Sequence, residues 1–230
     1  MFNNSFNSKY SNVLTIILII VIIAILGLIG FLGYDFYRKY YIDKDAQDFM
    51  EEYEEQLQNN TIDQNTVTTD NTISTIIDPL NEVTTSTGNT NTGTSNKVQT
   101  YKGFNVLGII EIPKTGIKYP VLDKVTTKSL EASVAYYYGP GLNQVGNTVI
   151  YGHNYRNGAF FGKNKQLSNG DIIYITDNSG KRIKYTIYNI YKTTDMDAEY
   201  ITRDTNGARE ISLSTCTDDS KGRLIIWAKE

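Results

Sequence analysis

The chain has 230 residues, with 22 Lys and Arg against 25 Asp and Glu, and its net charge of −3 comes without the basic stripe that a nucleic-acid partner would require. Its single cysteine excludes an internal disulfide, and no CxxC pair or Cys/His metal spacing is present. We therefore expect no nucleic-acid partner, no metal and no cofactor. The single cysteine, Cys216, and the single histidine, His153, are the first candidates for chemistry.

A long uncharged segment lies near the N-terminus. Residues 13–34, VLTIILIIVIIAILGLIGFLGY, contain no charged side chain. As a helix rising about 1.5 Å per residue they would span roughly 33 Å, enough for the hydrocarbon core of a bilayer. A secretory signal peptide has a shorter apolar region and a small-residue cleavage site, neither of which fits well here. We predict a transmembrane helix at 13–34, preceded by a cytoplasmic tail at 1–12.

The charges beside this segment give a conflicting orientation signal. The positive-inside rule counts Lys9 on the N-terminal side against Arg38, Lys39 and Lys44 on the C-terminal side, where acidic residues are mixed among them. Taken alone, the count weakly favours keeping the C-terminal part inside the cell. We nevertheless expect the C-terminal domain to lie outside the cell, against this charge count.

Two segments of different character follow the apolar stretch. Residues 35–58 are charged, aromatic and rich in helix formers, so we expect a juxtamembrane helix that continues the anchor. Residues 59–101 are expected to form a flexible linker, because Thr and Asn fill 20 of the 38 positions 59–96 and leave too little apolar surface to offset the ordering entropy. A tether of about 40 residues has an r.m.s. reach of some 35 Å, so the domain that follows it could occupy a range of positions near the membrane.

Residues 102–230 have the length of one domain and the pattern of a mainly β fold. The turn 177–180, Asp-Asn-Ser-Gly, is typical of a hairpin. Only 126–133 and 158–167 are predicted to be helical. Many short strands with few helices favour a barrel or a sandwich. Strands are predicted at 105–113, 117–122, 147–153, 171–176, 182–191, 209–216 and 223–229.

Three reactive side chains lie where predicted strands meet loops. Cys216 and His153 each end a strand, and Arg223 begins the last one, so neighbouring strands would bring all three to one edge of the sheet. A thiolate attacks acyl carbons, an imidazole transfers the proton that a leaving amine needs, and a guanidinium stabilises negative charge on the carbonyl oxygen. Together they would support acyl transfer through a thioester. Each residue alone is also compatible with a structural role, such as a small buried cysteine.

These motifs resemble the sortases, membrane-anchored cysteine transpeptidases of mostly Gram-positive bacteria. The family pattern is a TLxTC strand end, an Arg on the next strand and a His after an upstream strand. Here it reads LSTC at 213–216, Arg223 in GRLIIWAK and VIYGHN at 149–154. The segment LGIIEIPKTGIKYPVL at 107–122 is similar to the family's first strands. YGPGLNQVGNTVIYGHN resembles its glycine-rich approach to the histidine. The resemblance spans the whole of 102–230.

The resemblance implies a closed eight-stranded sortase-type β-barrel with short helices. It implies Cys216 as nucleophile, His153 as general acid/base and Arg223 as oxyanion or substrate-positioning donor, with Asn154 and Thr215 helping to shape the substrate site. Such enzymes cleave a C-terminal sorting signal of surface proteins, commonly LPxTG-like, after its Thr. They pass the acyl group to an amine of a cell-wall peptide precursor or of a pilin. The expected location is the cell membrane, single-pass, with the catalytic domain outside the cell.

The sortase class stays open on the sequence. The first position of the TLxTC pattern is Ser212 here, a change expected to affect packing more than chemistry. GHNYRNGAFF and GRLIIWAK look like class B. His153 and Cys216 are 63 positions apart, which leaves no room for the long helical insertion of class B, and this compactness looks more like class D. Tyr155 and Arg156 are interpreted as turn residues in preference to substrate-loop residues.

Two rival functions remain to be weighed against a sortase. An L,D-transpeptidase would carry a His two residues before the Cys, where this chain has Ser214, so that reading is disfavoured. The alternative outside the enzymes is a membrane-tethered, non-catalytic β-domain that binds wall or host ligands and keeps Cys216 buried. A thiol that stays inert in the folded protein would favour this alternative.

Overall fold

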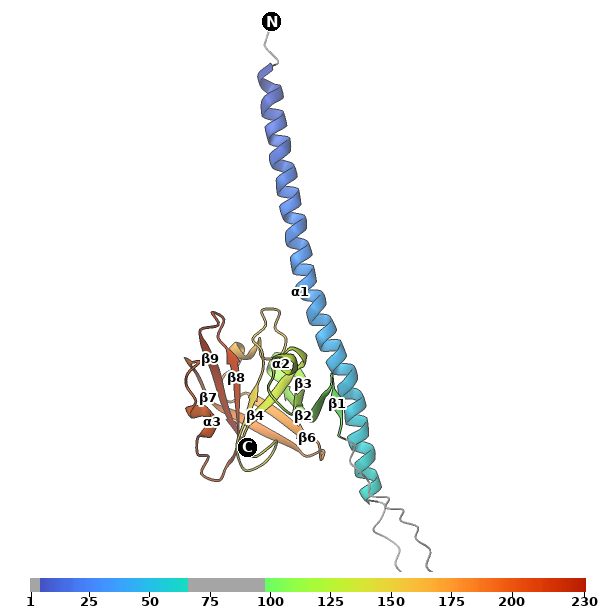
Figure 1. Ribbon diagram of the computed structural model, residues 1–230, viewed down its shortest axis with the longest axis vertical. Helices are drawn as coiled ribbons and strands as arrows, with labels where there is room; N and C mark the ends of the chain where they lie inside the picture. The colour runs from blue at the N-terminus through green and yellow to red at the C-terminus, as the bar shows by residue number, and fades with distance from the viewer. Residues whose placement is uncertain (1–4, 66–97) are drawn as a thin grey trace, which may run out of the picture.

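A computed structural model describes residues 5–65 and 98–230, and it shows a long helix beside a β-barrel (Figure 1). The helix, α1 (Ser5–Asn65), includes the range 13–34 predicted as the transmembrane helix and the range 35–58 predicted as the juxtamembrane helix. Residues 66–97, most of the predicted linker, lie outside the described residues. Of the described part of that linker, residues 59–65 continue α1, and Thr100–Tyr101 form the short strand β1.

The first half of α1 carries the apolar surface of the predicted anchor. Its large aliphatic side chains from Val13 to Leu32 are all exposed, and Figure 1 shows this part of the helix standing clear of the barrel. Within the described residues, α1 is the one helix long and apolar enough to cross a membrane. An exposed apolar surface of this length fits a lipid environment better than water.

Eight strands close into a barrel, as predicted. Strand β2 pairs with both β3 and β6, so the hydrogen-bonded order β2-β3-β4-β5-β8-β9-β7-β6 returns to its start, and β1 adds to β2 outside the ring. Closure leaves no long exposed edge among these strands. The strands are β2 (Phe104–Ile112), β3 (Ile117–Leu122), β4 (Val134–Tyr138), β5 (Gly146–Tyr151), β6 (Ile172–Asp177), β7 (Arg182–Thr194), β8 (Arg209–Cys216) and β9 (Gly222–Lys229).

The helical elements of the barrel are short and differ in part from the prediction. The helix predicted at 126–133 is present as α2 (Thr127–Ala132), begun by a capping box at Thr126. The helix predicted at 158–167 is wrong, because only a 3-10 turn, η2 (Asn164–Gln166), forms there. A positive φ at Gly158 and at Phe160 turns the chain in this segment and interrupts any helix. The other two elements, not predicted, are η1 (Pro113–Thr115) and α3 (Glu199–Thr202).

Alternating apolar residues fill the barrel interior, as the strand pattern requires. Ile150, Leu213 and Tyr185 are fully buried there. In β7 the alternation is broken by an irregularity between Ile187 and Asn189, after which Ile190 also packs against the interior cluster. A second, smaller cluster lies on the outer face of the sheet under α3 and consists of Val149, Tyr200 and Ile225, with Tyr151, Tyr191, Ile201 and Trp227 partly buried around it.

A buried ion pair fastens the segment after α3 to this outer face. Arg203 pairs with Glu210 of β8, and both side chains are only about one-tenth exposed. The same guanidinium donates to the Tyr188 hydroxyl and to the Asn147 side-chain oxygen, each at 3.1 Å. It also lies over the Trp227 ring, 4.5 Å from the ring centroid. These contacts fix the wall of the barrel beside the first residues of β5 and β8.

Replacing Glu210 by alanine is expected to destabilise the barrel by about 3–5 kcal/mol, because it leaves the Arg203 guanidinium buried without its charge partner. Chemical unfolding of the full chain, followed by the fluorescence of Trp227, the chain's one tryptophan, measures this change. Asp195→Ala, which removes an exposed acid from the connection between β7 and β8, is the matched control and should change little. Equal unfolding free energies for the two variants would show that the pair contributes no net stability.

Candidate active site

The strand register places His153 and Cys216 at the same level on adjacent strands. β5 and β8 run parallel and end with Tyr151 paired to Ser214. Beyond that pair, the Gly152 amide donates to the Ser214 carbonyl at 3.2 Å, and the Thr215 hydroxyl donates to the Gly152 carbonyl at 2.7 Å. The next residue on each strand is His153 or Cys216, so both emerge at one end of the barrel. This adjacency of the strands is as predicted.

Arg223 completes the group from the third strand. It pairs with Cys216 across the antiparallel ladder of β8 and β9, and its Nη1 lies 3.4 Å from the Cys216 Sγ. The guanidinium also lies 5.7 Å from the centroid of the Tyr151 ring. Cys216 is partly exposed and Arg223 likewise, so the thiol is open to solvent and touches a permanent positive charge. A structural cysteine would be expected in the apolar interior instead.

His153 is half-buried at the start of the loop that follows β5. Its ring lies 5.0 Å from the ring of Tyr155, and its carbonyl accepts a hydrogen bond from the Phe161 amide at 3.0 Å. Burial lowers the pKa of His153 below its ordinary value; the Arg38 charge lowers it further, and Glu131 opposes the shift. The imidazole is therefore neutral near pH 7 and able to accept a proton.

Gly152 allows the histidine to sit where it does. A Cβ atom at this position would lie 2.6 Å from the Phe161 ring and 2.9 Å from Val134, closer than packed atoms tolerate. The chain can pass between these two buried residues only without a side chain. Any larger residue at 152 would have to displace the start of the His153 loop.

Asn154 and Thr215 lie on either side of the catalytic candidates and bind backbone. The Asn154 side-chain amide donates to the Cys216 carbonyl at 2.8 Å and to Asp218 at 3.0 Å, so it ties the histidine loop to the cysteine strand. Thr215 is buried at 2 % exposure, and its hydroxyl is bonded to Gly152. In the described part of the chain, no three His, Cys, Asp or Glu side chains are grouped to hold a metal ion.

Comparison with known protein families shows which kind of protein carries this group of residues. The family model described as "Sortase domain" matches residues 110–230, more than half of the chain. The chain belongs to the sortase family. The matched range contains all three reactive residues and every strand from β3 to β9, together with the end of β2. The search of curated proteins found no match for this sortase.

Solved structures similar to this sortase include members of two named types. A Clostridium perfringens Sortase D5 transpeptidase is 27 % identical over 54 % of this chain and 78 % of its own, with a TM-score of 0.50. Sortase A from Corynebacterium diphtheriae, as a lid mutant, is 26 % identical over 55 % of this chain and 70 % of its own, also at 0.50. The similarity covers the part of the sortase that forms the barrel.

A cleft of about 520 Å³ in this sortase lies between the end of β4 and the end of α3, and Cys216, His153 and Arg223 are not among its lining residues. The Tyr137 ring, one wall of the cleft, stacks on the Tyr151 ring at a centroid distance of 4.4 Å, and Tyr151 in turn faces Arg223. The cleft is thus joined to Cys216 through two aromatic rings and a guanidinium. The sequence analysis did not predict this aromatic side of the cleft, although the run of three tyrosines at 136–138 was an available signal. The cleft is lined by Tyr136, Tyr137, Tyr138, Gly139, Pro140, Asn147, Ile201, Thr202 and Arg203.

Proposed function

We propose that this sortase is a cysteine transpeptidase that uses Cys216 as nucleophile, His153 as general acid/base and Arg223 as oxyanion or substrate-positioning donor. The observation that carries the proposal is the 3.4 Å contact between the Arg223 guanidinium and the Cys216 thiol, with His153 at the same level on the adjacent strand. A guanidinium remains charged at any working pH, so it can stabilise negative charge that develops on a nearby atom.

The chemistry proceeds in two acyl-transfer steps. The neutral imidazole of His153 takes the proton of the Cys216 thiol, and the resulting thiolate attacks the carbonyl carbon of the substrate's Thr. The Arg223 guanidinium stabilises the negative charge that develops on the oxygen. The C–N bond then breaks, and His153 gives that proton to the departing amine, leaving a thioester on Cys216. An acceptor amine attacks the thioester, transfers its proton to His153 and releases the thiolate. The peptide product keeps the acyl group, and His153 returns the proton to Cys216, which restores the starting state.

Asn154 and Thr215 support this chemistry by placing the two reactive residues. The Asn154 amide connects the histidine loop to the Cys216 carbonyl, and the buried Thr215 hydroxyl connects β8 to Gly152. Through these bonds a shift of either strand end would be passed to the other. We therefore assign both residues a positioning role, with direct substrate contact more plausible for the part-exposed Asn154 than for Thr215.

The proposed substrates are C-terminal sorting signals of secreted surface proteins, LPxTG-like or related. The cleft bounded by Tyr137 and Arg203 has room for a short extended peptide, and its aromatic wall suits apolar residues ahead of the scissile bond. The proposed acceptor is an amine of a cell-wall peptide precursor or of a pilin. The short span from His153 to Cys216 favours a D-like class, with B-like sequence motifs, whereas the similarity to a Sortase D5 transpeptidase is equalled by the similarity to a sortase A.

The proposed location is the cell membrane of a Gram-positive bacterium, where surface proteins are attached to the wall. We assign 1–12 to the cytoplasmic tail, 13–34 to the membrane span, 35–58 to the juxtamembrane helix, 59–101 to the linker and 102–230 to the catalytic domain outside the cell. The exposed apolar first half of α1 supports the span. The sortase fold supports export, because sorting signals and wall acceptors are presented on the outer face of the membrane.

Trapping of the acyl-enzyme tests the proposed chemistry. Full-length protein in detergent is mixed with an LPxTG-like peptide in the absence of an acceptor amine, quenched with acid and digested. The peptide containing Cys216 should gain the mass of the substrate's acyl half, and hydroxylamine should remove it, as expected of a thioester. A folded protein with an unreactive Cys216 thiol would contradict the proposal and favour the non-catalytic binding domain.

A further inference from the structure

The second half of α1 packs against the barrel. Ala46, Met50 and Tyr53 of this helix are buried, and they belong to the same core cluster as the residues of β2 and β3. Figure 1 shows α1 running beside β1, β2 and β3. The remaining apolar members of the packed stripe, each partly buried, are Ile42, Phe49 and Leu57. Spaced three and four residues apart, these side chains form one face of the helix.

Polar contacts fix the helix along and around its axis. Asp43 accepts a hydrogen bond from the Tyr119 hydroxyl, and Glu54 pairs with Lys118 at 2.8 Å. The two barrel partners, Tyr119 and Lys118, lie on β3. Between the two acidic residues of the helix, Asp45 accepts from the Tyr101 hydroxyl at 2.9 Å and pairs with Lys102 at 2.7 Å. These contacts spread over three turns of the helix, on both sides of its apolar face, and resist both sliding and rotation. They hold the barrel against α1, whereas a flexible linker alone would leave the barrel free to move relative to the helix.

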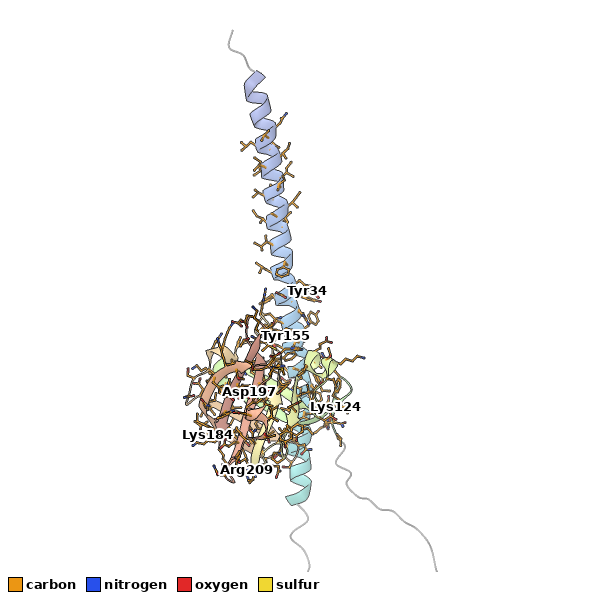
Figure 2. All side chains as sticks on the ribbon, turned by 60° about the vertical axis from the view of Figure 1, so that its left-hand side comes forward. Tyr34, Lys124, Tyr155, Lys184, Asp197 and Arg209 are labelled. Atoms are coloured by element: carbon orange, nitrogen blue, oxygen red, sulfur yellow. The ribbon has the colours of Figure 1, made fainter. Side chains whose placement is uncertain are left out.

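The docked helix brings Arg38 to the histidine loop. The Arg38 Cζ lies 5.0 Å from the centroid of the Tyr155 ring, and that ring lies 5.0 Å from the ring of His153. Tyr155 also contacts Phe160 at 5.6 Å and packs against the core cluster. Figure 2 shows Tyr155 at the end of the barrel that is nearer Tyr34, with Arg209 at the opposite end. Arg38 of the helix and Tyr155 of the loop therefore stand in series up to His153.

The loop that carries His153 is held to its surroundings by several contacts, among them the bonds of the Asn154 amide to the Cys216 carbonyl and to Asp218. It lies outside the regular sheet and is tied by an isolated bridge between Asn154 and Phe160 and by the bond from the Phe161 amide to the His153 carbonyl. A cation held over the Tyr155 ring is attracted to it and limits the motion of that ring beside His153. The contact lies only four residues beyond Tyr34, about one helical turn from the end of the predicted membrane span.

The charges around His153 come from several elements. Arg38 of α1 lowers the pKa of the imidazole, whereas Glu131 of α2 raises it. Cys216 and Arg223 belong to the neighbouring strands, and Tyr155 stacks from within the loop. Removal of Arg38 should therefore raise the pKa of His153, while Glu131 continues to favour the protonated form.

We propose that Arg38 is a positioning residue of this enzyme, which holds Tyr155 against His153 so that the helix leaving the membrane forms part of the catalytic apparatus. This inference rests on the proposed role of His153. It assigns to α1 a function beyond anchoring, and it changes the interpretation of Tyr155 from a turn residue to the link between helix and histidine. Arg38 acts through Tyr155 and touches no reacting atom.

The test uses untagged full-length protein in nanodiscs of zwitterionic lipid. Because His153 is the only histidine, a ¹³C-histidine label gives one ring signal whose titration needs no assignment and no substrate. Arg38→Ala should raise the pKa of His153 and lower kcat roughly 2- to 5-fold, as expected for loss of one cation–π contact, with KM nearly unchanged. Lys44→Ala, an exposed position of the same helix, removes the same charge and should leave the titration and kcat as in the parent. Arg38→Lys should restore most of kcat.

A double variant decides whether Arg38 works through Tyr155. In a Tyr155→Leu background, Arg38→Ala should have no further effect on kcat, because the ring that it holds is already gone. A titration and kcat for Arg38→Ala that match those of Lys44→Ala would overturn the inference, as would an equal loss of kcat in both backgrounds. Failure of the parent protein to cleave any peptide would refute the proposed function. The inference about Arg38 would still be tested by the His153 titration, which needs no substrate.

Discussion

Replacement of Cys216 by alanine is expected to abolish peptide cleavage, with a loss of turnover on the order of 10⁴-fold or more. No other thiol exists in the chain, so nothing can form the thioester intermediate. The measurement is kcat on a quenched sorting-signal peptide, with full-length protein. Because Cys216 is only partly buried, the unfolding free energy should change by less than about 1 kcal/mol.

Cys216→Ser provides the matched control for this loss. It keeps the size and polarity of the side chain but replaces the thiol by a hydroxyl, which is a far weaker nucleophile without a strong base. It should fold as the parent does and be nearly as inactive as the alanine variant. Full activity in either variant would remove the thioester from the mechanism. Restoration of activity by serine alone would point to a hydroxyl nucleophile.

Arg223→Lys is expected to lower kcat about 10²- to 10³-fold, the usual cost of losing one donor to a developing oxyanion. Lysine keeps the positive charge but loses the planar group whose Nη1 contacts the Cys216 Sγ while its face lies over Tyr151. The loss should fall on kcat more than on KM if the contact tightens in the transition state. Stopped assays across a range of peptide concentrations separate the two constants.

The control for Arg223→Lys is the same substitution at Arg182. That guanidinium pairs with Glu111 at 2.9 Å near the β6–β7 hairpin, away from the reactive group. Arg182→Lys should leave both kinetic constants within a factor of about two of the parent, as expected for an exposed pair. Unchanged turnover in Arg223→Lys would exclude Arg223 from the mechanism and leave Cys216 and His153 as a dyad.

Much of the barrel could be predicted because its strands are marked locally. The alternation of apolar residues and the turn at 177–180 give β6, β7, β8 and β9 to within a few residues, and ordered motifs identify the family. Strand β4 was missed because its tyrosines at 136–138 are partly or fully exposed and give no inward alternation. The segment 158–167 was mistaken for a helix, because composition does not reveal the positive φ values that turn it.

The surroundings of the reactive residues could not be predicted to the same extent, because they depend on contacts between distant parts of the chain. Tyr151 and Tyr137 become a wall only when β4 lies beside β5. Arg38 reaches Tyr155 only because α1 docks on the barrel. The stripe of apolar residues from Ile42 to Leu57 was a local signal for that docking, and its spacing of three and four residues is typical of a packed helix.

The most direct test of the central claim is the position at which a sorting-signal peptide is cut. Full-length protein is incubated with a panel of LPxTG-like and NPxTN-like peptides and an acceptor amine, beside Cys216→Ala, and the products are identified by mass spectrometry. We expect cleavage between Thr and the following residue in at least one peptide, transfer of the acyl half to the amine, and neither product with the variant. Cleavage that persists in Cys216→Ala, or no cleavage by a folded protein whose thiol is inert, would contradict a cysteine transpeptidase.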